Sequence, residues 1–282
     1  MRCHECGSEE TISDSGGTYC KKCGLELESS IIYQKGYGLR RDAEKIARVP
    51  KVLFRIEPKK ELYALKLGLK NNKLTKDWSM LLGFKIKDSL LRSELKKSAL
   101  ILIKKAFEKH QLVLEDSKKR IEENWLKITN KYFREMEKLF KYDWQSYEYK
   151  CYLSLICNGG FHNSSKNFIV LQHKWDNASN YVIAHELFHI MFRNYITRFF
   201  KDRYDDFDET ISEVLVNFIL LTQANLRNLF PEIKFSLDMY ALDEHREMAK
   251  RLWPLWREQK PFKEIMIELY RLFGREKVWV SY

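Results

Sequence analysis

The five residues HELFH at 185–189 constrain the fold of this chain more than any other segment. Residues four apart lie on one face of an α-helix, so a helix here would present both imidazoles to a single zinc ion. Glu186 would stand beside that metal, where a carboxylate can act as general base on a water. The alternative is a helix whose histidines merely face solvent or make a polar core contact. A zinc site needs a third ligand, so the motif predicts a second helix packed against the first.

The segment DETISEVLVNFILL at 208–221 is the expected source of this ligand. Glu209, Glu213 and Asn217 recur every four residues and form one line along a helix. A carboxylate on this line can complete the site, and its neighbour one turn on can hold a ligand imidazole by its second nitrogen. Glu213 lies deeper in the apolar part of the helix, which favours Glu213 as the third ligand. The residues alone leave both Glu209 and Glu213 as candidates.

VIAHELFH resembles the active-site helix of the thermolysin-like gluzincins, and DETISE is similar to their N-E-x-I-S-D ligand motif. Nineteen residues separate His189 from Glu209. The resemblance implies a zinc metallopeptidase acting on proteins or peptides, with Glu186 as catalytic base. Both HELFH histidines (His185 and His189) and Glu209 would be the zinc ligands, and Glu213 would replace the orienting Asp. In small regulatory zincins, the E-x-x-x-N pattern implies instead that Glu213 is the ligand; spacing alone favours Glu209.

Two short apolar segments precede the motif, CYLSLIC at 151–157 and NFIVLQ at 167–172. Their β-branched and aromatic residues predict two strands that form a hairpin or lie side by side. By the gluzincin resemblance, NFIVLQ would be the edge strand along which an extended substrate pairs. His162 lies between the strands and could line the cleft, although a histidine in a loop is usually neither a metal ligand nor a base. Tyr204 and His245 are candidates for the residue that stabilises the oxyanion. Only their position in the chain suggests this role.

Four cysteines near the N-terminus form the pattern C-x2-C-x13-C-x2-C; they are Cys3, Cys6, Cys20 and Cys23. Each Cys-x-x-Cys pair can place two thiolates on one cation, and two pairs complete a tetrahedral sulfur site suited to zinc. A glycine follows each pair, where a tight turn favours a residue without Cβ. Redox pairs or unrelated thiols are the alternative. The sequence therefore predicts two zinc sites, one structural with four cysteines and one catalytic.

The segment CHECGS…CKKCGLELE resembles the zinc ribbon that opens archaeal and eukaryotic transcription factor B. In that family the ribbon docks on RNA polymerase, so the resemblance implies a partner in the transcription machinery. No evident pair of cyclin-like repeats follows the ribbon, and a role in promoter assembly is therefore not implied.

Positive charge is concentrated in the middle of the chain. Residues 41–150 carry 28 Lys and Arg against 16 Asp and Glu, which accounts for the whole net charge of +11. This asymmetry suggests contact with a polyanion such as DNA, although a solvated lysine-rich helix face would give the same pattern. The clearest basic patch could follow a phosphate backbone. It comprises Lys96, Lys97, Lys104 and Lys105.

Helical periodicity dominates the rest of the chain. It predicts helices at about 88–110, 116–141, 178–200, 207–229, 243–257 and 262–273. With 11 Gly and 5 Pro, the chain has few of the turn residues of an all-β protein. We therefore expect an α+β, mostly helical fold in three parts. These are a zinc ribbon at 1–34, a linker and basic helical segment at 35–110, and a minimal zincin domain with a small sheet at 111–282.

No apolar run approaches the roughly 18 residues of a membrane helix, and no signal-peptide stretch opens the chain. We expect a cytoplasmic protein without a membrane partner. The favoured function is a zinc endopeptidase that the ribbon and basic segment recruit to DNA or RNA polymerase. The alternative is a DNA- or polymerase-binding transcription regulator whose zincin domain is latent or not catalytic.

Overall fold

The structure is a computed structural model. It describes residues 8–14, 17–20, 26–29, 49–71, 95–174, 178–200, 204–240, 242–257 and 260–273. Of the segments 11–14, 17–20, 26–29, 67–71 and 95–98 it describes the backbone alone. Within these ranges the protein is mostly helical and has two small sheets, which confirms the α+β class.

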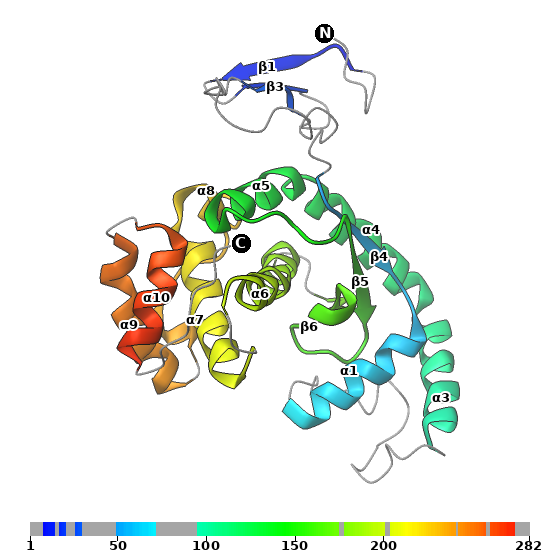
Figure 1. Cartoon of the computed structure of the whole chain (residues 1–282). Coiled ribbons are helices and arrows are strands. Elements are labelled where there is room, and N and C mark those ends of the chain that lie inside the picture. Colours follow the sequence, from blue (N-terminus) through cyan, green and yellow to red (C-terminus); the bar gives the residue numbers. More distant parts are fainter. Residues whose placement is uncertain are drawn as a thin grey trace.

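The first sheet is antiparallel, has the order β1-β2-β3 and is drawn apart from the larger body in Figure 1. Its strands are β1 (Thr11–Asp14), β2 (Gly17–Cys20) and β3 (Glu26–Ser29). Three of the four cysteines, Cys3, Cys6 and Cys23, lie outside the described residues, and the side chain of Cys20 does as well. The ribbon and its zinc site stay predictions.

The second sheet has the order β4-β5-β7-β6. Its strands are β4 (Lys51–Arg55), β5 (Glu148–Ser154), β6 (Gly160–Asn163) and β7 (Phe168–Gln172). β4, β5 and β7 are parallel, and β6 runs antiparallel to β7 at the end of the sheet. The two predicted strands are therefore neighbours but no hairpin. β7, which covers all of NFIVLQ except Asn167, was expected at the edge but is internal and buried, and β6 takes the edge position instead.

The helices agree closely with the periodicity. They are α1 (Pro58–Asn71), α3 (Leu95–Lys109), α4 (Gln111–Leu126), α5 (Thr129–Phe140), α6 (Ser179–Phe199), α7 (Asp206–Thr222), α8 (Ala224–Arg227), α9 (Asp243–Arg257) and α10 (Phe262–Leu272). Two short 3₁₀ turns, η2 (Ser164–Lys166) and η3 (Leu237–Met239), complete the described elements. Two predicted helices are interrupted: the one at 116–141 is divided into α4 and α5, and the one at 207–229 into α7 and α8. Residues 88–94 of the helix predicted at 88–110 lie outside the described residues. No helix in these ranges combines the length and apolar character of a membrane span.

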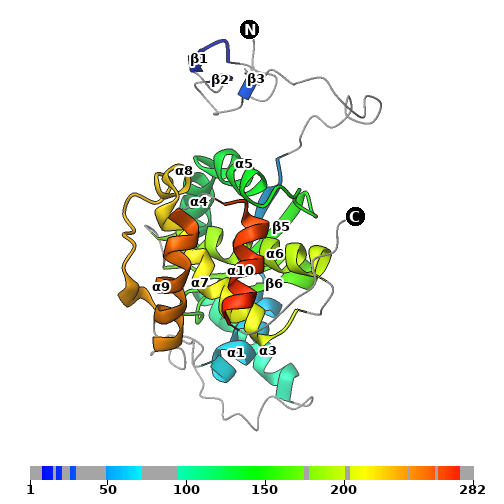
Figure 2. The ribbon, with the colours of Figure 1, turned by 60° about the vertical axis from the view of Figure 1, so that its left-hand side comes forward.

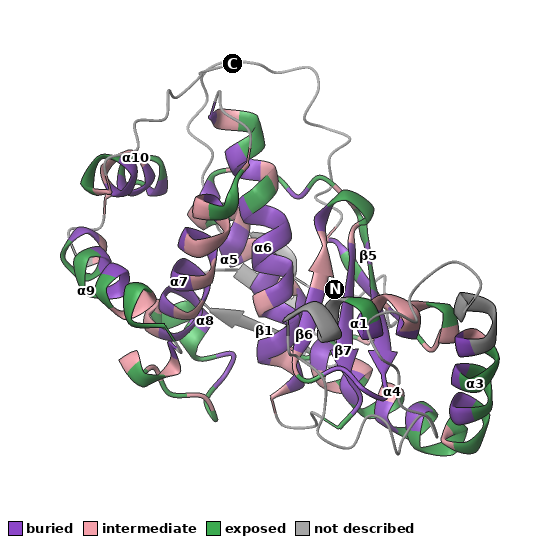
Figure 3. Cartoon of the chain, turned by 90° about the horizontal axis from the view of Figure 1, so that it is seen from below, coloured by how far each residue is buried: buried purple, intermediate pink, exposed green. Residues whose placement is uncertain are grey.

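Helix α6 lies at the centre of the molecule, between α7 on one side and β6 and β7 on the other (Figure 3). It is buried over most of its length because nearly all of its faces carry apolar side chains. α9 packs against α7, and α10 packs beside α9 (Figure 2). This arrangement holds the HELFH residues between a sheet edge and a second helix.

Strand β4 and the first part of α1 belong to the same core as the C-terminal part of the chain. Val52 and Phe54 of β4 and Leu65 of α1 lie in one apolar cluster with the residues of α6 and α7. Described side chains from both sides of the predicted boundary at 110/111 therefore pack in one cluster. β4 alternates buried and exposed residues, a pattern that was too short to stand out in the sequence.

Candidate metal centre

Helix α6 brings the two histidines of HELFH together. Their Nε2 atoms lie 3.0 Å apart, and the His189 side chain is 1% exposed. His189 Nδ1 lies 2.7 Å from Ser212 Oγ on α7. If Nε2 binds a metal, Nδ1 carries the proton and donates it to Ser212, which fixes the ring. Burial lowers the pKa of His189 to about 3, so this imidazole is neutral at ordinary pH.

Glu213 supplies the third donor. Its Oε2 lies 3.6 Å from His185 Nε2, and its Oε1 lies 3.6 Å from His189 Nε2. Two ligand atoms on a tetrahedral zinc ion are separated by roughly 3.3 Å, given metal–ligand bonds of about 2.05 Å. The three side chains therefore fit one zinc ion with little movement. The Glu213 side chain is 34% exposed, which leaves one side of the group open to solvent.

Glu209, which spacing alone favoured as ligand, lies elsewhere. Its Oε2 accepts a hydrogen bond of 2.7 Å from the Tyr204 hydroxyl, and it belongs to no candidate metal group among the described residues. Ser212 and Glu213 lie level with the HELFH histidines, whereas Glu209 is one helical turn, about 5.4 Å, nearer the start of α7. The structure thus favours the alternative register, with Glu213 as the ligand.

Asn217, one turn after Glu213, links the two helices. Its Oδ1 accepts a hydrogen bond from the Tyr181 hydroxyl at the start of α6, and its Nδ2 donates to the Glu213 carbonyl. The Tyr181 ring in turn lies 6.0 Å from the His185 ring. Asn217 therefore braces α7 against α6 beside the metal group.

Glu186 faces the sheet rather than α7. It is almost completely buried, and its Oε2 lies 2.9 Å from His162 Nδ1 on β6. Burial tends to raise the pKa of Glu186. The hydrogen bond and charge of His162, with a smaller contribution from His185, outweigh this and hold the pKa below its usual value. Glu186 is therefore ionised at neutral pH, as a general base must be.

His162 was expected from the sequence only as a residue that could line the cleft, and not as a member of the site. Its ring stacks on the His189 ring, with centroids 4.8 Å apart, and it forms a second candidate metal group with Glu186 and His189. The available signal was the strand alternation Gly160-Phe161-His162, which places the first and third residues on one face. Tyr204 bonds Glu209, and His245 lies beside Tyr240, so neither joins these groups.

The basic patch is described in part. Lys104 and Lys105 are exposed on α3, whereas the side chains of Lys96 and Lys97 lie outside the described residues.

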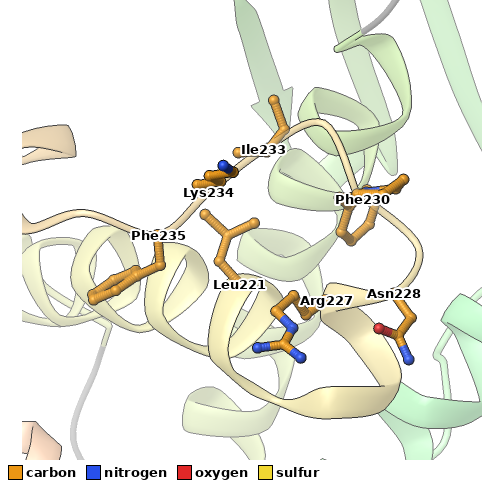
Figure 4. A pocket seen from close by; sticks show the side chains of 8 residues that line it. Leu221, Arg227, Asn228, Phe230, Ile233, Lys234 and Phe235 are labelled. Atoms are coloured by element: carbon orange, nitrogen blue, oxygen red, sulfur yellow. The ribbon is translucent and has the colours of Figure 1, made fainter.

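A separate pocket of about 590 Å³ lies where α7 leads into α8 and the following loop (Figure 4). Leu221 and Phe230 form part of its wall, and Arg227 and Lys234 bring two cations to it. None of the candidate metal ligands lines this pocket.

No protein-family model, no curated protein and no solved structure matches this chain. The functional argument therefore depends on the geometry of the site.

Proposed function

We propose that this chain is a zinc-dependent metallopeptidase whose active site lies between α6, α7 and β6. One observation carries the proposal. The Nε2 atoms of His185 and His189 and the carboxylate of Glu213 lie 3.0 to 3.6 Å from one another. Glu186, an ionised and buried carboxylate, lies on the same helix beside them.

The chemistry would divide between metal and protein. A bound zinc ion would supply a Lewis acid that polarises a peptide carbonyl and lowers the pKa of a water. Glu186 would accept a proton from the attacking water and deliver it to the amine nitrogen as the C–N bond breaks. Ser212 would hold the ring of His189. β6, at the end of the sheet, would offer backbone groups to an extended peptide.

Metal content tests the first half of the proposal. We expect about two zinc ions per purified wild-type chain, one on the four cysteines and one on this site, and about one in the His185→Ala variant. Elemental analysis on protein of known concentration measures the ratio. A ratio near one that His185→Ala leaves unchanged would mean that α6 holds no zinc, and the peptidase proposal would fail.

Hydrolysis of a mixed peptide library, followed by mass spectrometry, tests the second half. Glu186→Gln keeps the size of the side chain but removes the base, so we expect its cleavage rate to fall about 10²–10⁴-fold while both zinc ions stay bound. Equal cleavage by wild type and variant would contradict the role of Glu186. The transcription-regulator alternative predicts instead that Glu186→Gln keeps its biological effect.

We further propose that the basic face of α3 binds nucleic acid. Lys104 and Lys105 are exposed on it and make no ion pair with a described acidic group. Replacing both with Ala should weaken DNA binding and reduce the slope of log K against log salt concentration by about two. Lys250→Ala, at a lysine paired with Glu247, is the matched control. A salt-independent affinity would remove this proposal.

A further inference from the structure

Strand β6 approaches Glu186 more closely than an ordinary strand could. A Cβ atom placed on Gly160 would lie 2.7 Å from Glu186 Oε1 and 2.7 Å from Val182 Cγ1. Real Cβ atoms are essentially never found at such distances, so only glycine fits here without a shift. The glycine lets the strand backbone lie directly against one oxygen of the carboxylate.

His162 contacts the other oxygen. Two residues along a strand point to the same face, so His162 follows Gly160 toward α6, while Phe161 packs in the cluster on the opposite face. His162 Nδ1 lies 2.9 Å from Glu186 Oε2. The ring is nearly parallel to the His189 ring, at an interplanar angle of 18°, and the stacking fixes the plane in which the Nδ1 proton points.

Each of the two carboxylate oxygens of Glu186 therefore has a different neighbour. Oε2 is the acceptor for His162, and Oε1 lies against the backbone at Gly160. A general base works efficiently only when its oxygen is held within hydrogen-bonding reach of the proton that it takes. A buried carboxylate with one oxygen engaged by a fixed imidazole has lost most of its rotational freedom. Oε1 is then the oxygen left for proton transfer.

We propose that His162 is a positioning residue, which holds Glu186 in the orientation needed for proton transfer by donating a hydrogen bond from Nδ1 to Oε2. This inference rests on the proposed peptidase function. It differs from a metal-ligand role for His162, in which the imidazole would bind the ion itself.

Three substitutions at one position test the inference in the zinc-loaded, full-length protein. The amide nitrogen of Asn lies near the place of Nδ1, that of Gln lies near the place of Nε2, and Ala has no donor. We expect His162→Ala to lower kcat about 10–100-fold with little change in KM or zinc content. His162→Asn should recover much of this loss, and His162→Gln should not. In the Glu186→Gln background, His162→Ala should cause no further loss.

The outcomes separate the two proposals. A wild-type protein that hydrolyses no peptide would overturn the peptidase function and this inference together. A hydrolytic wild type with an unchanged His162→Ala variant would overturn this inference alone. Loss of the second zinc ion in His162→Ala would show that the residue is a ligand, and the positioning role would likewise fall. Equal activity of the Asn and Gln variants would contradict donation from Nδ1.

Discussion

At the scale of single residues, the structure distinguishes two glutamates, Glu209 and Glu213, which lie one turn apart on α7. Glu213 reaches both imidazoles, whereas Glu209 bonds Tyr204. We therefore expect Glu213→Ala to lose the zinc ion of the α6 site and Glu209→Ala to keep it. Glu213→Ala removes a metal-ligand oxygen, whereas Glu209→Ala removes only the hydrogen-bond acceptor of the Tyr204 hydroxyl. Zinc per chain, measured after dialysis against a weak chelator, distinguishes the variants.

These two variants control for each other, because both shorten a partly exposed glutamate on the same helix. The inverse result, with zinc lost only in Glu209→Ala, would restore the gluzincin register that spacing favours. Loss in both would point to a general effect on α7 instead, and the circular dichroism of the two variants would reveal it.

The sequence could predict part of this site. His185, Glu186 and His189 follow from helix periodicity alone, because they are within one turn of each other. The third ligand depends on how α6 and α7 cross, and a one-turn shift between two helices leaves the pattern of both unchanged. His162 depends on the pairing of a four-residue strand, whose alternation is too short to be read with assurance.

At the scale of elements, the position of β6 controls the surroundings of Glu186. An added methyl group at Gly160 would overlap Glu186 and Val182, so Gly160→Ala must displace the carboxylate, the strand or both. We expect a loss of roughly 1–3 kcal/mol in the free energy of unfolding, as is typical of overpacking. Urea unfolding followed by circular dichroism measures it. The rate of cleavage should fall as well, because the Glu186 carboxylate is one of the two groups nearest to the added methyl.

Asn158→Ala in the preceding loop is the matched control, since Asn158 is exposed and its truncation should change the free energy of unfolding by less than about 0.5 kcal/mol. A Gly160→Ala protein with wild-type stability and activity would mean that β6 can move away from α6 freely. The close approach would then have no part in positioning Glu186.

The longer elements were predictable because their pattern repeats over several turns, as in α6, α9 and α10. The break between α4 and α5 was not. The stripe from Ile121 to Met136 continues on one face across it, so periodicity cannot reveal the interruption. At the break, the Thr129 hydroxyl donates to the Trp125 carbonyl, a local bond that competes with regular helix geometry.

At the scale of the whole molecule, α1 and β4 pack in the core of the C-terminal part. They do so although they belong to the strongly basic region of the sequence, residues 41–150. The sequence predicted a linker and basic helical segment there, because the excess of positive charge lies in residues 41–150. A buried carboxyl group adds a polar contact to the strand pairing and apolar packing that connect them. Glu61 of α1 is 1% exposed, and its Oε1 accepts hydrogen bonds from the amides of Leu155 (2.9 Å) and Ile156 (3.0 Å), just after β5.

This connection should make global stability depend on pH. Burial, opposed by hydrogen bonds from Ser154 and the two amides, raises the pKa of Glu61 from 4.5 to about 7. Between these values the unfolded chain has released this proton and the folded chain retains it. The free energy of unfolding contributed by Glu61 therefore falls as pH rises from 4.5 to 7, by up to about 3 kcal/mol. Below this window the contribution is fully present.

Glu61→Gln isolates the effect, since its amide oxygen can accept the same two hydrogen bonds and does not titrate. We expect the difference in unfolding free energy, variant minus wild type, to rise across pH 4.5–7 and then level off, with the variant more stable above pH 7. The contribution of His189 to the pH dependence is the same in both proteins, so it cancels in this difference. Urea titrations of zinc-saturated protein at several pH values measure the difference. A difference independent of pH would mean that Glu61 is ionised throughout, with its two amide bonds outweighing the cost of burial.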